Sequence, residues 1–286
     1  MKVLGIVSVF YPDLSDLERN IKSYLSELDY LILWDNTPAS ATELTRLTEK
    51  LNNPKIEIRT TGKNEYLAYP FNECIKWAKE NSFTHILTMD QDSFFEEKDF
   101  SRFISDVANN SDDNKIMIYT SCNDEKEKTI NTNEIKFQEV ELAITSGSIY
   151  KMEVFDKIGY FREDYLIYMI DIEFSMRVRK NGYKIVRFPH IILNHQSGYA
   201  SKNNLGFLIN NYSAQSTYYI IRNVILNWKL YPKNYSLKDK LKFLKYKIGY
   251  RTLKIVFETN PFLKLKAIYV ALFHGLVGKS GEYEIR

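Results

Sequence analysis

The sequence is poor in the residues that mark extended, disulfide-rich or membrane-spanning proteins. Its 286 residues include only 11 Gly, 7 Pro and 2 Cys, while 44% are apolar and 26% are charged. This composition excludes disordered and collagen-like chains, and two cysteines cannot build a disulfide framework or a cysteine-rich zinc site. The most apolar stretch, residues 267–277, is shorter than the about 20 residues that cross a bilayer. We therefore expect a soluble, cytoplasmic, globular protein.

Several common phosphate-binding and nucleophilic motifs are also missing. The sequence contains no G-x-x-x-x-G-K-[ST] or G-x-G-x-x-G loop, no serine-centred nucleophile elbow and no His-x-x-x-His spacing. A P-loop or a dinucleotide site therefore has no support. If the protein binds phosphates, a metal ion and basic side chains must hold them.

The net charge of +3 is distributed unevenly along the chain. Residues 229–266 contain eleven Lys or Arg and two acidic residues, which gives this segment a charge of +9 and leaves −6 for the rest. Such a split points to an anionic partner: a lipid surface, a nucleic acid or a phosphorylated substrate. No nucleic-acid recognition module is visible, so we expect no nucleic-acid partner. A solvated face of packed helices, with Lys stems covering apolar surface, explains the segment equally well.

Apolar runs alternate with helical periodicity over the first ninety residues. Runs at residues 3–10, 30–34, 56–59 and 85–89 predict strands, and apolar spacing over 14–28, 44–51 and 70–80 predicts helices between them. This order indicates an α/β fold with a mostly parallel sheet. Further on, strands are predicted over 115–119, 139–144 and 183–188, and helices over 154–158 and 170–180. After Ser216 the pattern is almost purely helical, so we expect a catalytic domain over residues 1–210 and a basic helical region over 211–286.

Polar residues follow three of the predicted strands directly, at residues 11–13, 35–37 and 90–93. In open parallel sheets, ligands bind beyond the carboxyl ends of the strands. The third of these turns, Asp90-Gln91-Asp92, places two carboxylates where they can converge on one divalent ion, and hard oxygen ligands suit Mg²⁺ or Mn²⁺. His195 is a candidate third ligand. A solvated turn or a helix N-cap, together with a structural histidine, remains the alternative.

Another pair of carboxylates, Asp171 and Glu173, lies at the start of the helix predicted over 170–180. The field at a helix N-terminus lowers the pKa of a carboxyl group unless burial opposes it, and in a pocket such a group can act as a general base. The alternative is an ordinary exposed i,i+4 pair between Glu173 and Arg177. The apolar and aromatic residues 165–170 argue against a freely solvated position for Asp171.

Taken together, these motifs resemble the inverting, GT-A-fold glycosyltransferases of family 2, and within them the bacterial rhamnosyltransferase-like branch. The resemblance runs from residue 3 to about residue 223. It rests on features that occur in the family's order: Val9-Phe10-Tyr11-Pro12-Asp13, Trp34-Asp35-Asn36-Thr37, Gly62-Lys63-Asn64 with Asn72, Leu87-Thr88-Met89-Asp90-Gln91-Asp92-Ser93, Ile144-Thr145-Ser146-Gly147-Ser148, Asp171-Ile172-Glu173-Phe174 with Arg177, His195 before Gly198, and Tyr218-Tyr219 with Arg222-Asn223.

The resemblance implies a Rossmann-like GT-A fold, with a mostly parallel central sheet and helices on both faces, followed by a C-terminal helical appendage. It also implies a transferase that uses Mn²⁺ or Mg²⁺ and a nucleotide-sugar donor, with a dTDP- or UDP-linked sugar. The favoured reaction moves L-rhamnose from dTDP-rhamnose to a hydroxyl of a cell-surface glycan precursor, which can be lipid-linked. UDP-hexose and UDP-galactofuranose are the alternative donors.

Roles for individual residues follow from the same resemblance. Asp171 would be the general base that takes the proton of the acceptor hydroxyl. Asp90 would lie near the ribose and the metal, and Asp92 and His195 would be metal ligands. The remaining positions would form the donor and acceptor sites: Phe10, Tyr11 and Asp35 at the nucleoside, Asn64 in the donor site, Thr145, Ser146 and Gly147 on the floor below the sugar, and Arg222 at the diphosphate or the acceptor.

The sequence departs from the family pattern in two places. Residues 65–71 read EYLAYPF, where the family usually has a Gly-rich stretch with small residues, and this puts the identity of the donor sugar in doubt. Ile170 stands before Asp171, where many relatives carry an acid that could raise the pKa of the base. A phosphatase of the haloacid-dehalogenase type is a remote alternative, because it also places D-x-D after an apolar strand.

Family acceptors are often carried on lipids, so the resemblance favours peripheral association of residues 229–266 with the anionic inner face of the cell membrane. The sequence does not determine the oligomeric state.

Overall fold

The structure is a computed structural model, and it describes residues 1–38, 41–96, 98–122, 137–195, 201–202, 208–209, 212–255 and 257–286, of which 41, 42, 195, 201, 202, 208 and 209 are described by their backbone alone. The chain divides into two compact units. Unit 1 consists of Met1–Arg162 and Asp171–Gln196, and unit 2 consists of Glu163–Ile170 and Ser197–Arg286.

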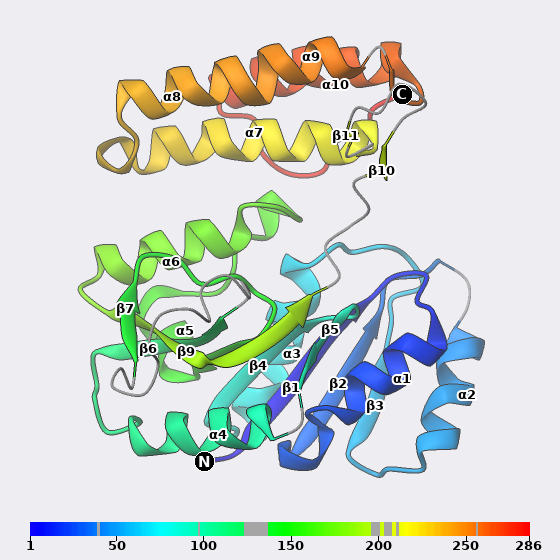
Figure 1. Cartoon of the computed structure of the whole chain (residues 1–286), viewed down its shortest axis with the longest axis vertical. Coiled ribbons are helices and arrows are strands. Elements are labelled where there is room, and N and C mark those ends of the chain that lie inside the picture. The colour runs from blue at the N-terminus through cyan, green and yellow to red at the C-terminus, as the bar shows by residue number, and fades with distance from the viewer. Residues whose placement is uncertain are drawn as a thin grey trace. The chain divides into compact units, whose positions relative to one another are not determined.

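Unit 1 contains a mixed sheet (Figure 1). Among the described residues it has nine strands, which run in the order β3-β2-β1-β4-β8-β6-β9-β5, while β7 pairs with β9. Their bounds are β1 Val3–Val9, β2 Tyr30–Asp35, β3 Ile56–Arg59, β4 His85–Asp90, β5 Ser93–Phe95, β6 Ile116–Cys122, β7 Gln138–Val140, β8 Ser148–Lys151 and β9 Lys184–His195. The predicted strands at 3–10, 30–34, 56–59 and 85–89 are confirmed within one residue at each end.

Strands β3, β2, β1 and β4 are parallel neighbours, as the alternation of strands and helices predicts. Ser8 in β1 lies opposite both Trp34 in β2 and Asp90 in β4. The carboxyl ends of these strands therefore reach the same edge of the sheet at the same level. Strand β8 is antiparallel to both β4 and β6, which makes the sheet mixed beyond β4.

Helices cover both faces of this sheet. In Figure 1, α1, α2 and α4 lie in front of the parallel strands and α3 lies behind them. Because both faces are buried, the parallel strands β1, β2 and β4 read as apolar runs in the sequence. The helices of unit 1 are α1 Leu14–Lys22, α2 Ala41–Leu51, α3 Ala68–Glu80, α4 Asp99–Asn109, α5 Glu153–Ile158 and α6 Ile170–Lys180, with a 3₁₀ turn η1 at Leu25–Glu27.

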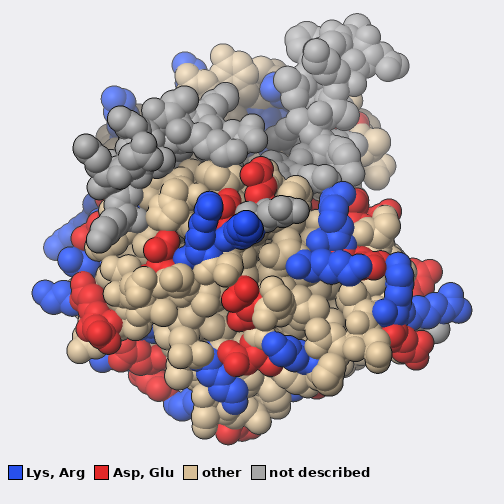
Figure 2. Space-filling view, turned by 60° about the horizontal axis from the view of Figure 1, so that its bottom comes forward, with Lys and Arg blue, Asp and Glu red and all other residues tan. Residues whose placement is uncertain are grey.

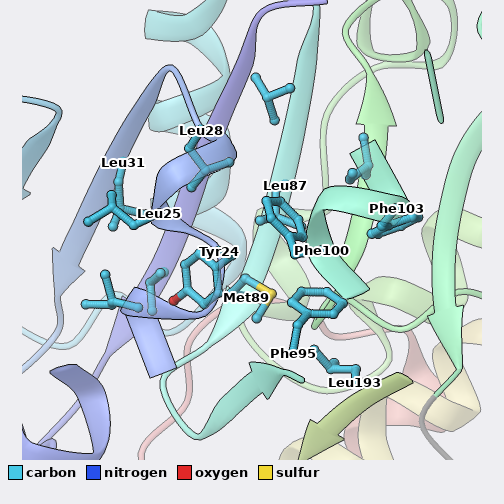
Figure 3. Packing of buried hydrophobic residues seen from close by; sticks show 14 of the residues in the cluster. Tyr24, Leu25, Leu28, Leu31, Leu87, Met89, Phe95, Phe100, Phe103 and Leu193 are labelled. Carbon is cyan, nitrogen blue, oxygen red and sulfur yellow. The ribbon is translucent and has the colours of Figure 1, made fainter. Parts of the chain in front are cut away.

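The larger apolar cluster of unit 1 lies between the sheet and the front helices (Figure 3). Leu87 and Met89 of β4 point from the sheet into the same cluster as Tyr24 and the rings of Phe95 and Phe100. The last two ring centroids are 5.0 Å apart. This packing fixes the position of β4, whose end carries Asp90.

Unit 2 is helical apart from the short pair β10 Ser201–Lys202 and β11 Leu208–Ile209. Its other elements are η3 Glu163–Tyr165, α7 Ala214–Leu230, η4 Pro232–Asn234, α8 Leu237–Phe243, the π-helical segment η5 Leu244–Gly249, α9 Tyr250–Ile255 and α10 Pro261–Val277. The predicted helical C-terminal region is therefore present. None of the described helices is long and apolar enough to cross a membrane.

The division of the chain differs from the boundary expected between residues 210 and 211. Unit 2 begins at Ser197 and also includes Glu163–Ile170. The amide of Asn223 explains this inserted segment, because Asn223 Nδ2 donates to the backbone carbonyls of Tyr165, Ile167 and Tyr168 at 2.8–3.0 Å. Local periodicity cannot reveal such long-range contacts.

Candidate functional site

The end of β1 is fixed to the Asp90-Gln91-Asp92 turn by Gln91. The Phe10 backbone N–H donates to Gln91 Oε1 at 2.7 Å, and Gln91 Nε2 donates back to the Phe10 carbonyl at 3.2 Å. Next along the chain, Tyr11 has a φ of +44°, and its backbone N–H donates to Thr37 Oγ1 at 2.9 Å. The Phe10 and Tyr11 rings are exposed and their centroids lie 4.6 Å apart. The edge of the sheet therefore presents two aromatic faces.

The end of β2 is held to the loop after β3 by Asn36. Asn36 Nδ2 donates to the carbonyl of Tyr66 at 2.6 Å, and its Oδ1 accepts the Glu65 backbone N–H at 2.9 Å. Asn64 Oδ1 accepts the backbone N–H of Tyr66 at 2.8 Å, so Asn64 shapes this loop. Asp35 is 2% exposed, and its Oδ1 accepts the Thr37 backbone N–H at 2.8 Å. Asp35 and Asn64, two of the predicted donor-site residues, therefore belong to one hydrogen-bonded region.

Asp90 and Asp92 flank the turn between β4 and β5, and both are half-buried. Ser146 bridges the two sides of this turn, because its hydroxyl accepts the Asp90 backbone N–H at 3.1 Å and donates to Ser93 Oγ at 2.8 Å. Asp92 does not cap a helix, since β5 begins at Ser93. The structure thus places both carboxylates on a braced turn at the edge of the sheet.

His195 is the last residue of β9, and its side chain lies outside the described residues. In the antiparallel pairing of β5 with β9, Ser93 lies opposite His195. The backbone of His195 is therefore adjacent to the residue that follows Asp92. Among the described residues no group of three or more His, Cys, Asp or Glu side chains could hold a metal ion.

The Thr145–Gly147 segment passes beside the end of β4. The Thr88 hydroxyl donates to the Thr145 carbonyl, and the Gly147 backbone N–H donates to the Thr88 carbonyl at 2.9 Å. Gly147 has a φ of +72°, and an added Cβ would lie 2.6 Å from Ser121 Oγ and 2.7 Å from Leu193 Cδ2. Glycine is required here both for its backbone conformation and for the close approach of these side chains.

Asp171 lies in the first turn of α6 and is half-buried. Burial raises the pKa of Asp171, although the backbone N–H of Ile172, which donates to Oδ1 at 2.8 Å, opposes the rise. At this helix N-terminus, desolvation thus outweighs the stabilisation of the charged form. A carboxylate with a raised pKa is a better proton acceptor than an ordinary aspartate.

Tyr150 connects Asp171 with Asp90. Its ring is 1% exposed, and burial is the main cause of the raised pKa of its phenol. The negative charges of Asp171 and Asp90 raise the pKa of Tyr150 further, while hydrogen bonding with Thr88 and Ser148 lowers it. Both carboxylates are therefore within electrostatic range of one buried hydroxyl. The end of β4, which pairs with β8, and the start of α6, whose Phe174 packs on Tyr150 of β8, therefore lie near the same side chain.

An aromatic cluster fixes α6 against the sheet. The Phe174 ring, one turn after Asp171, packs against Tyr150 and Phe161 at centroid distances of 5.8 and 4.6 Å. The side chain of Asn72 in α3 holds the backbone of Phe161, because Nδ2 donates to the Phe161 carbonyl at 2.9 Å and Oδ1 accepts the Phe161 N–H at 3.0 Å. The start of α6 is therefore positioned by contacts from α3 and β8.

The i,i+4 pair between Glu173 and Arg177 is present, but it is not an exposed one. Arg177 donates to Glu173 through Nε at 3.1 Å and Nη2 at 2.8 Å, and Glu173 is 2% exposed. Arg177 Nη1 also donates to the carbonyl of Ile158 at 2.8 Å. Glu173 is thus committed to a bidentate structural pair, which leaves Asp171 as the carboxylate of α6 that is suited to chemistry.

Arg222, which the sequence places at the diphosphate or the acceptor, has a different environment. It is fully buried in unit 2, where Nη2 donates to the Asp164 carbonyl at 3.1 Å and Nη1 donates to the Gly281 carbonyl. Its Nε donates to Asn223 Oδ1 at 2.9 Å. Burial and these bonds commit the guanidinium to the packing of unit 2, so the donor site proposed below does not include Arg222.

Two residues with clear roles at this edge were not predicted. Gln91 was treated as the spacer of the D-x-D motif, and Tyr150 lies in a short strand that the sequence pattern does not indicate. Gln91 lies between the two predicted metal ligands, and Tyr150 lies three residues after Gly147. Their partners come from distant parts of the chain, so only the structure identifies their function.

The fold and the edge-located carboxylates together define a glycosyltransferase of the GT-A class. The sequence model of "Glycosyl transferase family 2" matches residues 6–180, more than half of the chain. The protein therefore belongs to glycosyl transferase family 2. This match favours the transferase over the phosphatase alternative.

One curated relative and several solved structures are similar to this chain. The "dTDP-rhamnosyl transferase RfbF" of Shigella flexneri is 25% identical over 295 residues, which cover 98% of this chain and 97% of the relative. The mannosyltransferase PcManGT from Pyrobaculum calidifontis, solved with GDP-Man and Mn²⁺, aligns with a TM-score of 0.57 and 12% identity over 99% of this chain and 76% of its own.

Two further structures support the fold. GalNAc-T7, solved with UDP, GalNAc and Mn²⁺, has a TM-score of 0.60 and 13% identity over 81% of this chain, which spans only 49% of GalNAc-T7. S. aureus TarS 1–349, solved with UDP-GlcNAc, has a TM-score of 0.53 and 15% identity over 96% of this chain and 81% of that one. At such identities the structural similarity establishes the GT-A fold alone.

Proposed function

We propose that this protein transfers L-rhamnose from dTDP-rhamnose to a hydroxyl of a cell-surface glycan precursor, with inversion at the anomeric carbon. The observation that carries the proposal is that Asp90 and Asp171 both lie within electrostatic range of Tyr150, the β8 residue on which the Phe174 ring of α6 packs. A transferase needs a binding group for the leaving diphosphate and a base for the acceptor at one site. The similarity to a dTDP-rhamnosyl transferase over almost the whole chain supports the choice of donor.

In this proposal, Asp171 removes the acceptor's proton. The acceptor oxygen attacks the anomeric carbon, the bond from that carbon to the diphosphate oxygen breaks, and the hydroxyl proton moves to the Asp171 carboxylate. A single displacement needs only one base. Burial of Asp171 supports this role because a raised pKa favours proton acceptance.

The residues at the D-x-D turn fit a divalent ion. Asp90 and Asp92 offer hard oxygen ligands on a turn that Ser146 braces, and Mg²⁺ or Mn²⁺ commonly takes one or two carboxylates with water and substrate phosphates. We propose His195, whose backbone lies opposite Ser93, as a further ligand. When bound, the ion would stabilise negative charge on the leaving diphosphate. PcManGT and GalNAc-T7, both solved with Mn²⁺, support this assignment by analogy.

The donor nucleoside would lie against the ends of β1 and β2. The exposed rings of Phe10 and Tyr11 suit stacking against a base, and Asp35 with the loop shaped by Asn64 would bind the base or the ribose. The floor below the sugar would be formed by Thr145, Ser146 and Gly147. UDP-hexose and UDP-galactofuranose are the alternative donors, because aromatic residues occupy the stretch at 65–71.

The acceptor would be a glycan, free or carried on a lipid, and unit 2 would bring the enzyme to the anionic inner surface of the membrane. Exposed apolar side chains accompany the basic residues of 229–266 along the helices of unit 2. Leu237, Leu253 and Phe262 are 73%, 69% and 86% exposed. Such a combination of apolar and cationic side chains is typical of helices that lie at a lipid interface.

The base assignment is tested with Asp171→Asn. We expect transfer to fall by about 10²–10⁴-fold, the usual contribution of a general base, while the dissociation constant of the nucleotide donor stays within about twofold. Asp156→Asn, which removes an exposed carboxylate of α5, is the control for charge and should retain full activity. Initial rates with dTDP-rhamnose and calorimetry of donor binding measure both effects. Transfer within about tenfold of the unmodified protein would show that Asp171 is not the base.

A further inference from the structure

A pocket of about 320 Å³ lies wholly within unit 2, among α7, η5 and α9. None of the described residues that line it was predicted to bind the donor or the metal. Ile220 and Ile221 of α7 supply apolar wall, and η5 and α9 supply most of the polar groups. The pocket is therefore a second concave site, built entirely from the helical unit.

Three cations line one side of this pocket: Lys247, Arg251 and Lys254. Their spacing of four and three residues brings them to one face of the helical run formed by η5 and α9. Within the part of the chain that the structure describes, no ion pair involves Lys247 or Lys254. Both side chains are exposed, so their positive charges are available to a ligand.

Among the described residues that line the pocket, Glu258 is the one acidic group, and it does not cancel this charge. Its carboxylate lies 2.8 Å from Lys264 Nζ, and these side chains are only 1% and 2% exposed. Arg251 is farther from the same carboxylate, at 3.7 Å. The negative charge of Glu258 is therefore matched by Lys264, and the pocket keeps an excess of positive charge.

Arg251 is held in place for contact with a ligand. Its Nη2 donates to Thr217 Oγ1 at 2.7 Å, and its guanidinium carbon lies 5.4 Å from the centre of the Tyr212 ring. The Tyr246 and Tyr250 rings, which also line the pocket, are stacked at 5.5 Å. Hydroxyl and guanidinium donors beside two flexible ammonium groups suit the oxygens of a phosphate group.

The helix changes its winding at this point. Residues Leu244–Gly249 form a π-helical segment between α8 and α9. π-helical turns occur preferentially at functional sites, because the wider turn alters the direction of the side chains. The segment contains Tyr246 and Lys247, so the irregular turn lies within the pocket wall.

We propose that this pocket binds a phosphate group carried on a lipid. Leu244, Leu253 and Phe257, on the same helical run and directly after it, are 41%, 69% and 51% exposed. Apolar side chains beside a cationic pocket match a molecule that has an acyl or polyprenyl chain next to its phosphate. Free phosphate has no apolar surface that could pack against them. The inference deepens the proposed membrane function of unit 2, but it does not depend on the identity of the sugar.

The test uses the full chain and measures binding of dihexanoyl phosphatidic acid, below its micelle concentration, by calorimetry. Lys247→Gln/Lys254→Gln should weaken binding by about thirtyfold, since each cation near an anionic lipid contributes about a factor of five. The matched control is Lys233→Gln/Lys238→Gln, which removes the same charge from exposed positions of the basic segment outside the pocket lining. The control should change the affinity by less than about twofold.

Three results would overturn the proposal. Equal losses in both double variants would show diffuse charge attraction without a pocket. Inorganic phosphate that binds as tightly as the lipid would show that the chain attached to the phosphate is irrelevant. No measurable binding of the phosphatidic acid to the unmodified protein would remove the site. Donor binding, measured on the same samples, tests unit 1 separately, so a failure here is distinguishable from a failure of the transferase proposal.

Discussion

The two units of this protein differ in the side chains that they bury and expose. Unit 1 packs continuous apolar strands between helices, and in Figure 2 its acidic and basic side chains are interspersed over the face turned to the viewer. Unit 2 buries the polar side chains of Arg222, Asn223 and Asn227 in α7 together with apolar ones, and it exposes apolar side chains such as Leu253 and Phe262. The order of α7 therefore depends on buried hydrogen bonds as well as on apolar packing, whereas strands β1, β2 and β4 of unit 1 are held mainly by apolar burial.

The two units therefore hold the chain on either side of Asp171 in different ways. In unit 1, the sheet and its aromatic cluster position Asp90 and Asp171, and small displacements of either would weaken the proposed transfer. In unit 2, the buried amide of Asn223 and guanidinium of Arg222 fasten residues 163–170, the segment that leads directly to Asp171. The polar core of unit 2 therefore orders the segment that leads into α6, on which the proposed base Asp171 lies.

Arg222→Ala should have the largest effect on stability. It removes donors from the buried carbonyls of Asp164 and Gly281 and leaves a cavity, which together cost about 4 kcal/mol. Hydrogen exchange should rise in residues 163–170, 214–230 and 279–283 and stay unchanged in β1 and β4. Lys229→Ala, at the exposed end of the same helix, is the control and should cost less than about 0.5 kcal/mol.

If exchange rises equally in both units, the two do not differ in the way described, and the polar network supports the whole chain. A loss of less than about 1 kcal/mol would show that the guanidinium contributes little to unit 2.

Gly147→Ala probes the close packing of unit 1. The positive φ costs about 1 kcal/mol, and the clash of Cβ with Ser121 and Leu193 adds about 2 kcal/mol. Gly182→Ala is the matched control, because Gly182 has a φ of +81° and nothing within 4 Å of its added Cβ. We expect urea denaturation to show a loss of about 3 kcal/mol for the first and about 1 kcal/mol for the second. Equal losses would mean that the β4 edge tolerates the extra methyl group.

The parallel half of the sheet could be predicted because β1, β2 and β4 are buried on both faces and read as apolar runs, while the half-buried edge strand β3 alternates apolar and charged residues. Strand β8, Ser148–Lys151, could not, since four residues carry no periodic signal and its antiparallel partners β4 and β6 are distant in the sequence. The run over 139–144 was predicted as one strand, but only Gln138–Val140 pairs with β9.

Proline shows why the end of β9 was hard to predict. The sequence predicts a strand over 183–188 and, after Pro189-His190, a separate apolar strand that leads to His195, whereas β9 runs without interruption from Lys184 to His195. Strand β7 pairs with residues 185–187 and β5 with residues 193–195, so Pro189 falls between the two paired stretches. A proline is tolerated where no ladder partner requires its missing N–H.

The site could be predicted as a set of residue types, but not as a network. The acids at 90, 92 and 171 stand out because each follows or begins a regular element. Gln91 bonds the backbone of Phe10 just after β1, and Tyr150 lies within electrostatic range of Asp171 in α6. Buried Arg222 donates to the carbonyls of residues 164 and 281. Such contacts join residues that are distant in the sequence, and local sequence patterns do not report them.

Acid should weaken unit 1 through His85. Burial, with smaller contributions from Lys151 and the N-terminus, lowers the pKa of His85 to about 4. The unfolded chain takes up this proton near pH 6.5, so the native state loses stability as the pH falls from about 6.5 to about 4, by about 2 kcal/mol. His85→Phe should remove most of this slope, which hydrogen exchange of β1 and β4 peptides between pH 4 and 7 can measure.

His190→Gln is the control, because His190 is half-buried and paired with Asp106 at 2.8 Å, and this variant should keep the slope of unit 1. In unit 2, burial with Lys279 and Arg222 also lowers the pKa of His274, so the α10 peptides should stay acid-sensitive in His85→Phe. An unchanged slope in the β1 and β4 peptides of His85→Phe would show that another group makes unit 1 acid-labile.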